Sequence, residues 1–143
     1  ATAALIVVAA VALLGGLLVV LLSDNDDDAS GTNFTGDVRI LTPKDGEVVK
    51  GPVVLTVESP TWRIADPAEG IAGAAHFHAF VDIRPFTPSG MVIPEGAGIY
   101  HFQSDSLSLD LPPGEHRIIV ALGDNEDVRI PGATVSGVTV TVE

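Results

Sequence analysis

The chain has 143 residues, of which 46% are hydrophobic, and 19 acidic residues against 7 lysines and arginines give a formal net charge of −12. This excess of negative charge repels phosphates and anionic headgroups, so it argues against nucleic-acid binding and against docking on an anionic lipid surface. The sequence has no cysteine, which excludes disulfides and thiolate metal sites.

The first 22 residues form an apolar segment without a charged side chain. As a helix the segment would be about 33 Å long, close to the ~30 Å hydrocarbon thickness of a bilayer. A helix that is apolar on all sides belongs in lipid or in the core of an assembly. We therefore predict a transmembrane helix over residues 1–22 that contacts lipid and integral membrane subunits. Small residues permit close helix approach and mark the expected contact positions: Ala9, Ala12, Gly15 and Gly16.

Residues 23–36 are predicted to form an acidic linker, because residues 23–30 read SDNDDDAS. Cytoplasmic flanks normally carry lysine and arginine, so we expect the domain that follows to be extracytoplasmic, periplasmic or at the cell surface. The alternating aspartates of this segment suggest a calcium loop, but Ala29 stands where such a loop needs glycine. A solvated linker is the better interpretation.

Residues 37–143 show the pattern of strands, because short apolar stretches with period-two alternation are separated by turn signals. About seven short strands favour an all-β domain, an immunoglobulin-like antiparallel β-sandwich, after the membrane helix. The stretches are residues 38–41, 48–49, 53–57, 75–83, 98–103, 107–111, 116–122 and 135–142.

Two long irregular stretches, residues 60–73 and 83–98, interrupt this pattern. Loops of more than about 12 residues within a compact domain are commonly functional. Trp62, Phe86 and Met91 lie in these stretches and are candidates for binding a protein partner. The alternative is that they fold back and cover the ends of the sandwich.

The four histidines, His76, His78, His101 and His116, lie within 41 residues. Alternate residues of a strand share a face, so His76 and His78 are expected to point the same way. With a third histidine from a neighbouring strand they would suit copper or zinc. The opposite face of this strand is apolar and is expected to face the core. His116 alternates with apolar residues and is predicted to point inward, so the four should not converge. A structural or hydrogen-bonding role is therefore favoured, and a metal site built on His76 and His78 is the alternative.

Three segments resemble a bacterial family of small exported domains with GHFHLLID-type and PPGEHTLQLLLGD-type strands. They are residues 73–82 (GAAHFHAFVD), 99–102 (IYHF) and 109–124 (LDLPPGEHRIIVALGD). The resemblance covers roughly residues 38–143 and implies an exported all-β domain, with no established activity to transfer. The chain departs from the family at residues 125–131 (NEDVRIP), where the family typically has a histidine-bearing HxPH-like loop, and this departure argues against a metal site.

No catalytic function is expected, because the sequence has neither a G-x-S-x-G elbow nor a glycine-rich phosphate loop. The favoured function is that of a non-catalytic accessory subunit of a membrane complex, because the apolar segment ends at membrane length and turns abruptly to charge. A pilin-like filament subunit is an alternative, although Leu5 occupies the position of the early glutamate of type IV pilins. A histidine-based copper or zinc binding module is the third possibility, and no other cofactor is expected.

Overall fold

The computed structural model describes residues 36–84 and 86–143. The predicted membrane helix, its contact positions Ala9, Ala12, Gly15 and Gly16, and nearly all of the acidic linker lie outside the described residues. Within the described ranges no helix has the length and hydropathy to cross a membrane. The helical element found there is a single 3-10 turn, η1 (Pro67–Glu69).

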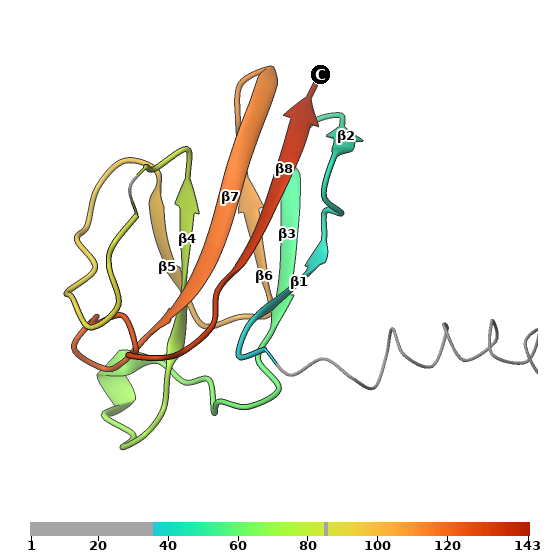
Figure 1. The fold of residues 1–143 in the computed structure, drawn as a ribbon. Coiled ribbons are helices and arrows are strands. Elements are labelled where there is room, and N and C mark those ends of the chain that lie inside the picture. The colour runs from blue at the N-terminus through green and yellow to red at the C-terminus, as the bar shows by residue number, and fades with distance from the viewer. Residues whose placement is uncertain (1–35, 85) are drawn as a thin grey trace, which may run out of the picture. The chain divides into compact units, whose positions relative to one another are not determined.

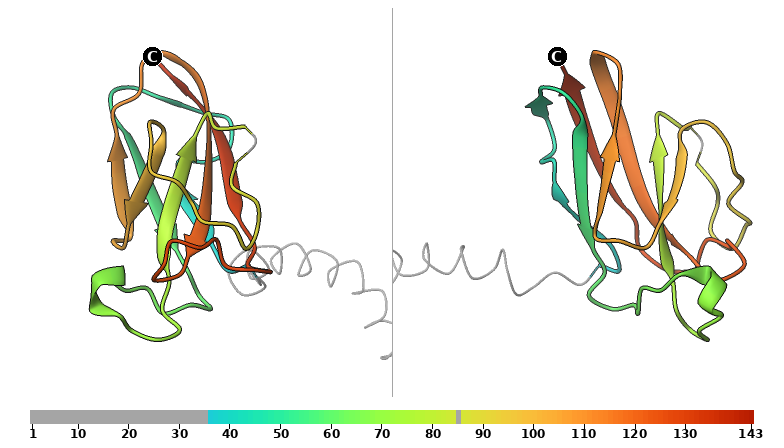
Figure 2. Two further views of the ribbon diagram at one scale, coloured as in Figure 1. Left: turned by 90° about the vertical axis from the view of Figure 1, so that its left-hand side faces the viewer. Right: turned by 180° about the vertical axis from the view of Figure 1, so that it is seen from behind.

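The described part folds into two β-sheets, which confirms the prediction of an all-β domain (Figures 1 and 2). The smaller sheet has the order β1 (Arg39–Thr42), β3 (Val53–Glu58) and β6 (Ser106–Leu109). The larger sheet has the order β2 (Glu47–Val49), β8 (Ser136–Val142), β7 (Gly114–Gly123), β4 (His76–Val81) and β5 (Ile99–Phe102).

One strand pair departs from the predicted antiparallel arrangement, because β2 runs parallel to β8. The cause is the short turn after β1, which carries the chain from the smaller sheet to the edge of the larger one. There the backbone N–H of Gly46 donates to the carbonyl of Thr139 over 2.7 Å, and the Asp45 carboxylate accepts from the Thr139 N–H over 2.8 Å. The other strand pairs are antiparallel.

The main core lies between the two sheets, where period-two alternation directs one face of each strand inward. The inward residues of β4 are Phe77, Ala79 and Val81, as the sequence predicts. Strands β3 and β7 contribute the same kind of alternating apolar face: Val53, Leu55, Val57, Ile118, Val120 and Leu122.

The outer face of the larger sheet is also covered, here by loops. Phe80, Ile119 and Ala121 project outward from β4 and β7 and form a second apolar cluster with Ile93 of the loop between β4 and β5. All six residues of β4 are therefore buried. His76 and His78 lie on this outer face, beneath loop rather than in open solvent.

Candidate metal centre

Three histidines gather on the outer face of β4 and its neighbour β5. His76 and His78 are two residues apart on β4 and share a face, and the strand register places His101 of β5 directly opposite His78. The ring centroids of His76 and His78 are 4.3 Å apart, and those of His78 and His101 are 4.2 Å apart. The sheet register thus supplies the third histidine that the sequence pattern required.

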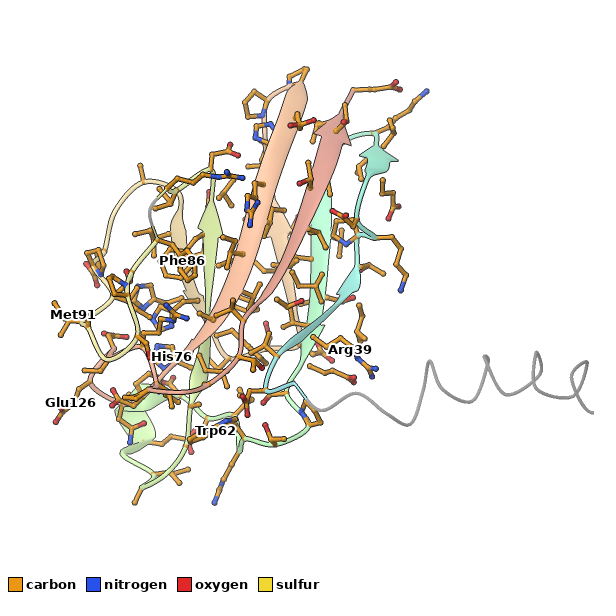
Figure 3. All side chains as sticks on the ribbon, in the orientation of Figure 1. Arg39, Trp62, His76, Phe86, Met91 and Glu126 are labelled. Atoms are coloured by element: carbon orange, nitrogen blue, oxygen red, sulfur yellow. The ribbon has the colours of Figure 1, made fainter. Side chains whose placement is uncertain are left out.

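A carboxylate from the loop after β7 reaches the same point. Asp127 Oδ1 lies 3.0 Å from His76 Nε2, 3.3 Å from His78 Nε2 and 3.3 Å from His101 Nδ1. The four candidate ligand atoms all lie within 4.8 Å of one another. Tetrahedral ligands at about 2.0–2.1 Å from zinc are themselves about 3.3 Å apart, so the three distances from Asp127 Oδ1 are close to the edges of a zinc coordination shell. Figure 3 places His76 at the start of β4.

The backbone of the loop positions Asp127 firmly. Asp127 has φ 60°, a left-handed conformation in which aspartate is enriched several-fold over most residues. Its N–H donates to the carbonyl of Asp124 over 3.0 Å, and its own carbonyl accepts from the N–H of Ile93 over 2.8 Å. The Asp124 carboxylate in turn accepts from the N–H groups of Glu126 and Val128, which closes the turn.

The two histidines of β4 are neutral at pH 7. Burial, reinforced by the neighbouring imidazoles of His76 and His101, lowers the pKa of His78 to about 3. Burial also lowers the pKa of His76, against the opposing charge of Asp127. The contacts of these two rings with Asp127 are therefore not ion pairs at neutral pH, and a neutral imidazole is the form that binds a metal.

Several ring nitrogens of this cluster have no hydrogen-bond partner among the described residues. Both nitrogens of His78, which is fully buried, and Nδ1 of His76 are in this position. A buried polar atom without a partner costs about 1–3 kcal/mol. A cation placed between the four candidate ligand atoms would give the lone pair of His78 Nε2 a partner.

Gly123 of β7 makes room for the central ring. It pairs with His76 in the strand register, and a Cβ built on it would lie 2.4 Å from Cε1 and 2.8 Å from Nδ1 of His78. Any side chain at this position would push the imidazole out of its present place, so glycine is required sterically.

The fourth histidine, His116, lies elsewhere, as the sequence analysis expected. Its Nδ1 is 2.7 Å from Asp82 Oδ2, and its Nε2 is 2.7 Å from the carbonyl of Pro112. The Pro112 carbonyl and an ionised Asp82 are both acceptors, so the doubly protonated imidazolium is the form of the ring that satisfies both contacts. The hydrogen bond with Asp82 accordingly raises the pKa of His116.

The three partner-binding candidates of the loops have different surroundings. Trp62 packs against the main core and donates its Nε1–H to Asp37 Oδ1 over 3.0 Å. Phe86 packs against the outer apolar cluster, with the guanidinium of Arg129 4.7 Å from its ring centroid. Met91 is 58% exposed. Trp62 also lines a hollow of about 390 Å³ with residues of the 124–131 loop.

Sequence reasoning named His76 and His78 but not the other two members of the cluster. It allowed for a third histidine on a neighbouring strand without choosing His101. Asp127 was not considered, and it lies in the stretch where the chain departs from the family with which it was compared. The aspartate gives no signal in the sequence, because its contribution depends on the left-handed turn that follows β7.

The chain belongs to the family described as a domain of unknown function (DUF4399), which matches residues 54–143 and so includes all four residues of the cluster. No curated protein matches the chain. Among solved structures, it is similar to the fibronectin(III)-like modules of Clostridium thermocellum CbhA, with 18% identity, a TM-score of 0.45, and coverage of 74% of this chain and 95% of the module. It is also similar to an endo-β-1,4-mannanase from Thermotoga petrophila, with 15% identity, a TM-score of 0.41, and coverage of 80% of this chain and 21% of the mannanase.

Proposed function

We propose that this member of the DUF4399 family binds one divalent transition-metal ion, zinc or copper(II), through His76, His78, His101 and Asp127. One observation carries the proposal. His78 is fully buried, neither of its ring nitrogens has a hydrogen-bond partner among the described residues, and its Nε2 lies 3.3 Å from Asp127 Oδ1, the oxygen that two further imidazoles approach to 3.0 and 3.3 Å.

The donor set favours zinc and copper(II) over other biological cations. Imidazole nitrogen is a ligand of borderline softness that suits both ions, and copper(II) binds such sites more tightly than zinc. Calcium takes six to eight oxygen ligands and magnesium needs near-octahedral oxygen, neither of which three imidazoles supply. Four protein ligands would complete the shell of zinc, an arrangement typical of structural rather than catalytic sites.

The competing interpretation is a hydrogen-bonded cluster without an ion. In that case Asp127 Oδ1 would accept from three rings at once. Nδ1 of His78 is buried without a partner with or without an ion, so the two interpretations differ at Nε2 alone. Such a cluster would add little to stability, whereas an ion would give Nε2 of His78, Nε2 of His76 and Nδ1 of His101 a common partner.

The test is calorimetric titration of Zn²⁺ and Cu²⁺ into the full-length chain, stripped with a chelator and held in mild detergent. We expect one ion per chain. His101→Ala and Asp127→Asn should each lower the metal affinity by more than roughly a hundredfold. Even the loss of a residue that only hydrogen-bonds to a metal ligand typically lowers affinity about 10–100-fold.

Two control variants match these changes without touching the cluster. His116→Gln removes a histidine, and Asp110→Asn removes an exposed carboxylate, so both should bind the ion like the wild-type chain. Circular dichroism of each variant checks the fold. Absence of binding by the wild-type chain, or equal weakening by His116→Gln and His101→Ala, would contradict the proposal.

We further propose that the domain is an exported, immunoglobulin-like module anchored in a membrane as a non-catalytic subunit of a larger complex. The apolar residues 1–22 and the aspartates of residues 23–30 support this role. Purification from native membranes in mild detergent tests it, because different membrane subunits should then copurify in fixed ratio. Recovery of many identical copies in helical order would instead favour the pilin-like alternative.

A further inference from the structure

The two loops that cover the outer face of the larger sheet are joined to each other by a short ladder. Val92 and Val128 form an antiparallel bridge. Beside it, Ile93 donates its N–H to the Asp127 carbonyl over 2.8 Å, and Arg129 donates its N–H to the Met91 carbonyl over 2.9 Å. We call residues 90–93 and 127–129 the loop ladder. In Figures 1 and 2 the two loops lie together next to β4 and β5.

The second loop of the ladder is bonded to the end of β7 through the Gly123–Arg129 bridge, and the next residue, Ile130, is buried in the main core. The ladder's own residues add little apolar surface to this attachment. Ile93 is the one fully covered apolar residue among its members in the described structure, and it packs on Phe80, Ile119 and Ala121. The core between the sheets, by contrast, contains 18 buried residues. Segments with few buried apolar contacts open at lower free energy than the core does.

Asp127 is the member of the loop ladder whose side chain reaches the histidines. Its backbone bonds to Ile93 of the other loop, while its carboxylate meets imidazoles from both β4 and β5. Without an ion, the hydrogen bond described between this carboxylate and the histidine rings is the one to His76 Nε2, over 3.0 Å. With an ion, the carboxylate would bind a divalent cation that the histidines hold on the sheet, which is a much stronger attachment.

We propose, on the basis of the metal site proposed above, that the bound ion fastens the loop ladder to β4 and β5. The order of both covering loops then follows the occupancy of the site. The ladder presents the exposed side chains of Met91 and Val92, which are 58% and 63% exposed. Metal binding therefore fixes the position of this apolar surface on an otherwise acidic domain.

Hydrogen exchange of the full-length chain, with and without Zn²⁺, tests the inference. The amides of Gly90, Ile93 and Arg129 all donate within or beside the loop ladder. We expect saturating zinc to slow their exchange by roughly tenfold or more, because a ligand that binds the closed form alone lowers the open population. The amides of β3 should change far less, since that strand lies in the other sheet.

Two variants of neighbouring acids separate the ion's effect from a general loss of charge. Asp127→Asn should abolish the slowing at Ile93 and Arg129, even at zinc concentrations that saturate whatever binding remains. Glu126→Gln removes one charge from the same loop, but its exposed side chain lies outside the cluster, so the slowing should persist.

The outcomes distinguish this inference from the function on which it rests. Zinc binding that leaves the exchange of the ladder amides unchanged would overturn the inference alone. Equal slowing in Asp127→Asn and the wild-type chain would also overturn it, because the carboxylate would then not be the attachment. Absence of zinc binding in the calorimeter would overturn both proposals together.

Discussion

The described residues contain two sites at which histidine meets aspartate, and the sites differ in how many acceptors are available to the ring nitrogens. His116 has an acceptor at each nitrogen, Asp82 on one side and the Pro112 carbonyl on the other, both at 2.7 Å. On the outer face of β4, three imidazoles share a single oxygen of Asp127. Each ring nitrogen of His116 therefore has its own acceptor, whereas the three imidazoles at Asp127 have to share one.

The histidine pKa shifts at the two sites have opposite directions because their main causes differ. Hydrogen bonds to Asp82 and to the Pro112 carbonyl raise the pKa of His116 and favour a fixed imidazolium. Burial lowers the pKa of His78 to about 3 and leaves its lone pair free. Burial alone therefore does not identify a metal ligand, since His116 is buried too. Unsatisfied nitrogen lone pairs that converge on one point are the better indicator.

Removal of the ion should produce the largest effect. At an ion concentration of a hundred times Kd, binding stabilises the folded state by about 2.7 kcal/mol. For a domain of about 100 residues this raises Tm by roughly 10 °C or more. Thermal unfolding of the full chain, with excess zinc and with excess chelator, measures the difference. His116→Gln should show the same metal-induced shift as the wild-type chain, and a shift confined to the wild-type chain would contradict the separation of the two sites.

Gly123→Ala should weaken the metal site without removing a ligand. The new Cβ would lie 2.4 Å from His78 Cε1, so the imidazole ring must move away from the other candidate ligand atoms. Crowding of this kind costs about 1–3 kcal/mol of stability, and we expect at least roughly a tenfold loss of zinc affinity in addition.

Gly137→Ala, in the adjacent strand β8, is the matched control for this change. Its Cβ would have ordinary contacts, the nearest at 3.5 Å from the carbonyl of Ile118. Calorimetric titration of zinc should therefore give the wild-type affinity for Gly137→Ala. Equal affinities for the two alanine variants would show that the position of the His78 ring does not matter for binding.

Much of the fold can be read from the sequence, because period-two alternation defines the inner faces of β3, β4 and β7. The same alternation places His76 and His78 together and directs His116 inward. The register between β4 and β5 cannot be read this way, since a long irregular loop separates the two strands. His101 therefore could not be paired with His78 in advance. Asp127 depends on a single left-handed residue in a turn, which no periodicity reports.

The smallest predicted effect concerns the contact between His116 and Asp82, whose contribution to the free energy of unfolding should depend on pH. Since the pKa of His116 is raised above its ordinary 6.5, the stability it contributes is present below pH 6.5 and is lost as pH rises through the raised value. Burial acts to raise the pKa of Asp82, but its hydrogen bonds with His116 and with the Arg117 N–H together lower this pKa below 3.8. The contribution of Asp82 is therefore present above pH 3.8 and is lost as pH falls through the lowered value.

The free energy of unfolding of the wild-type chain should thus exceed that of His116→Gln most between these two limits. We expect a difference of about 1 kcal/mol there, because a charged hydrogen bond is weakened when one partner, here Asp82, is half-exposed. Denaturant unfolding of both chains in excess chelator isolates this contact, since the metal site then contributes equally to each. The difference should shrink as pH rises above 6.5 and through the raised pKa of His116, where the imidazolium loses its proton. A difference that stays constant or grows over that range would mean that His116 is neutral, and the two histidine sites would then differ in burial but not in charge.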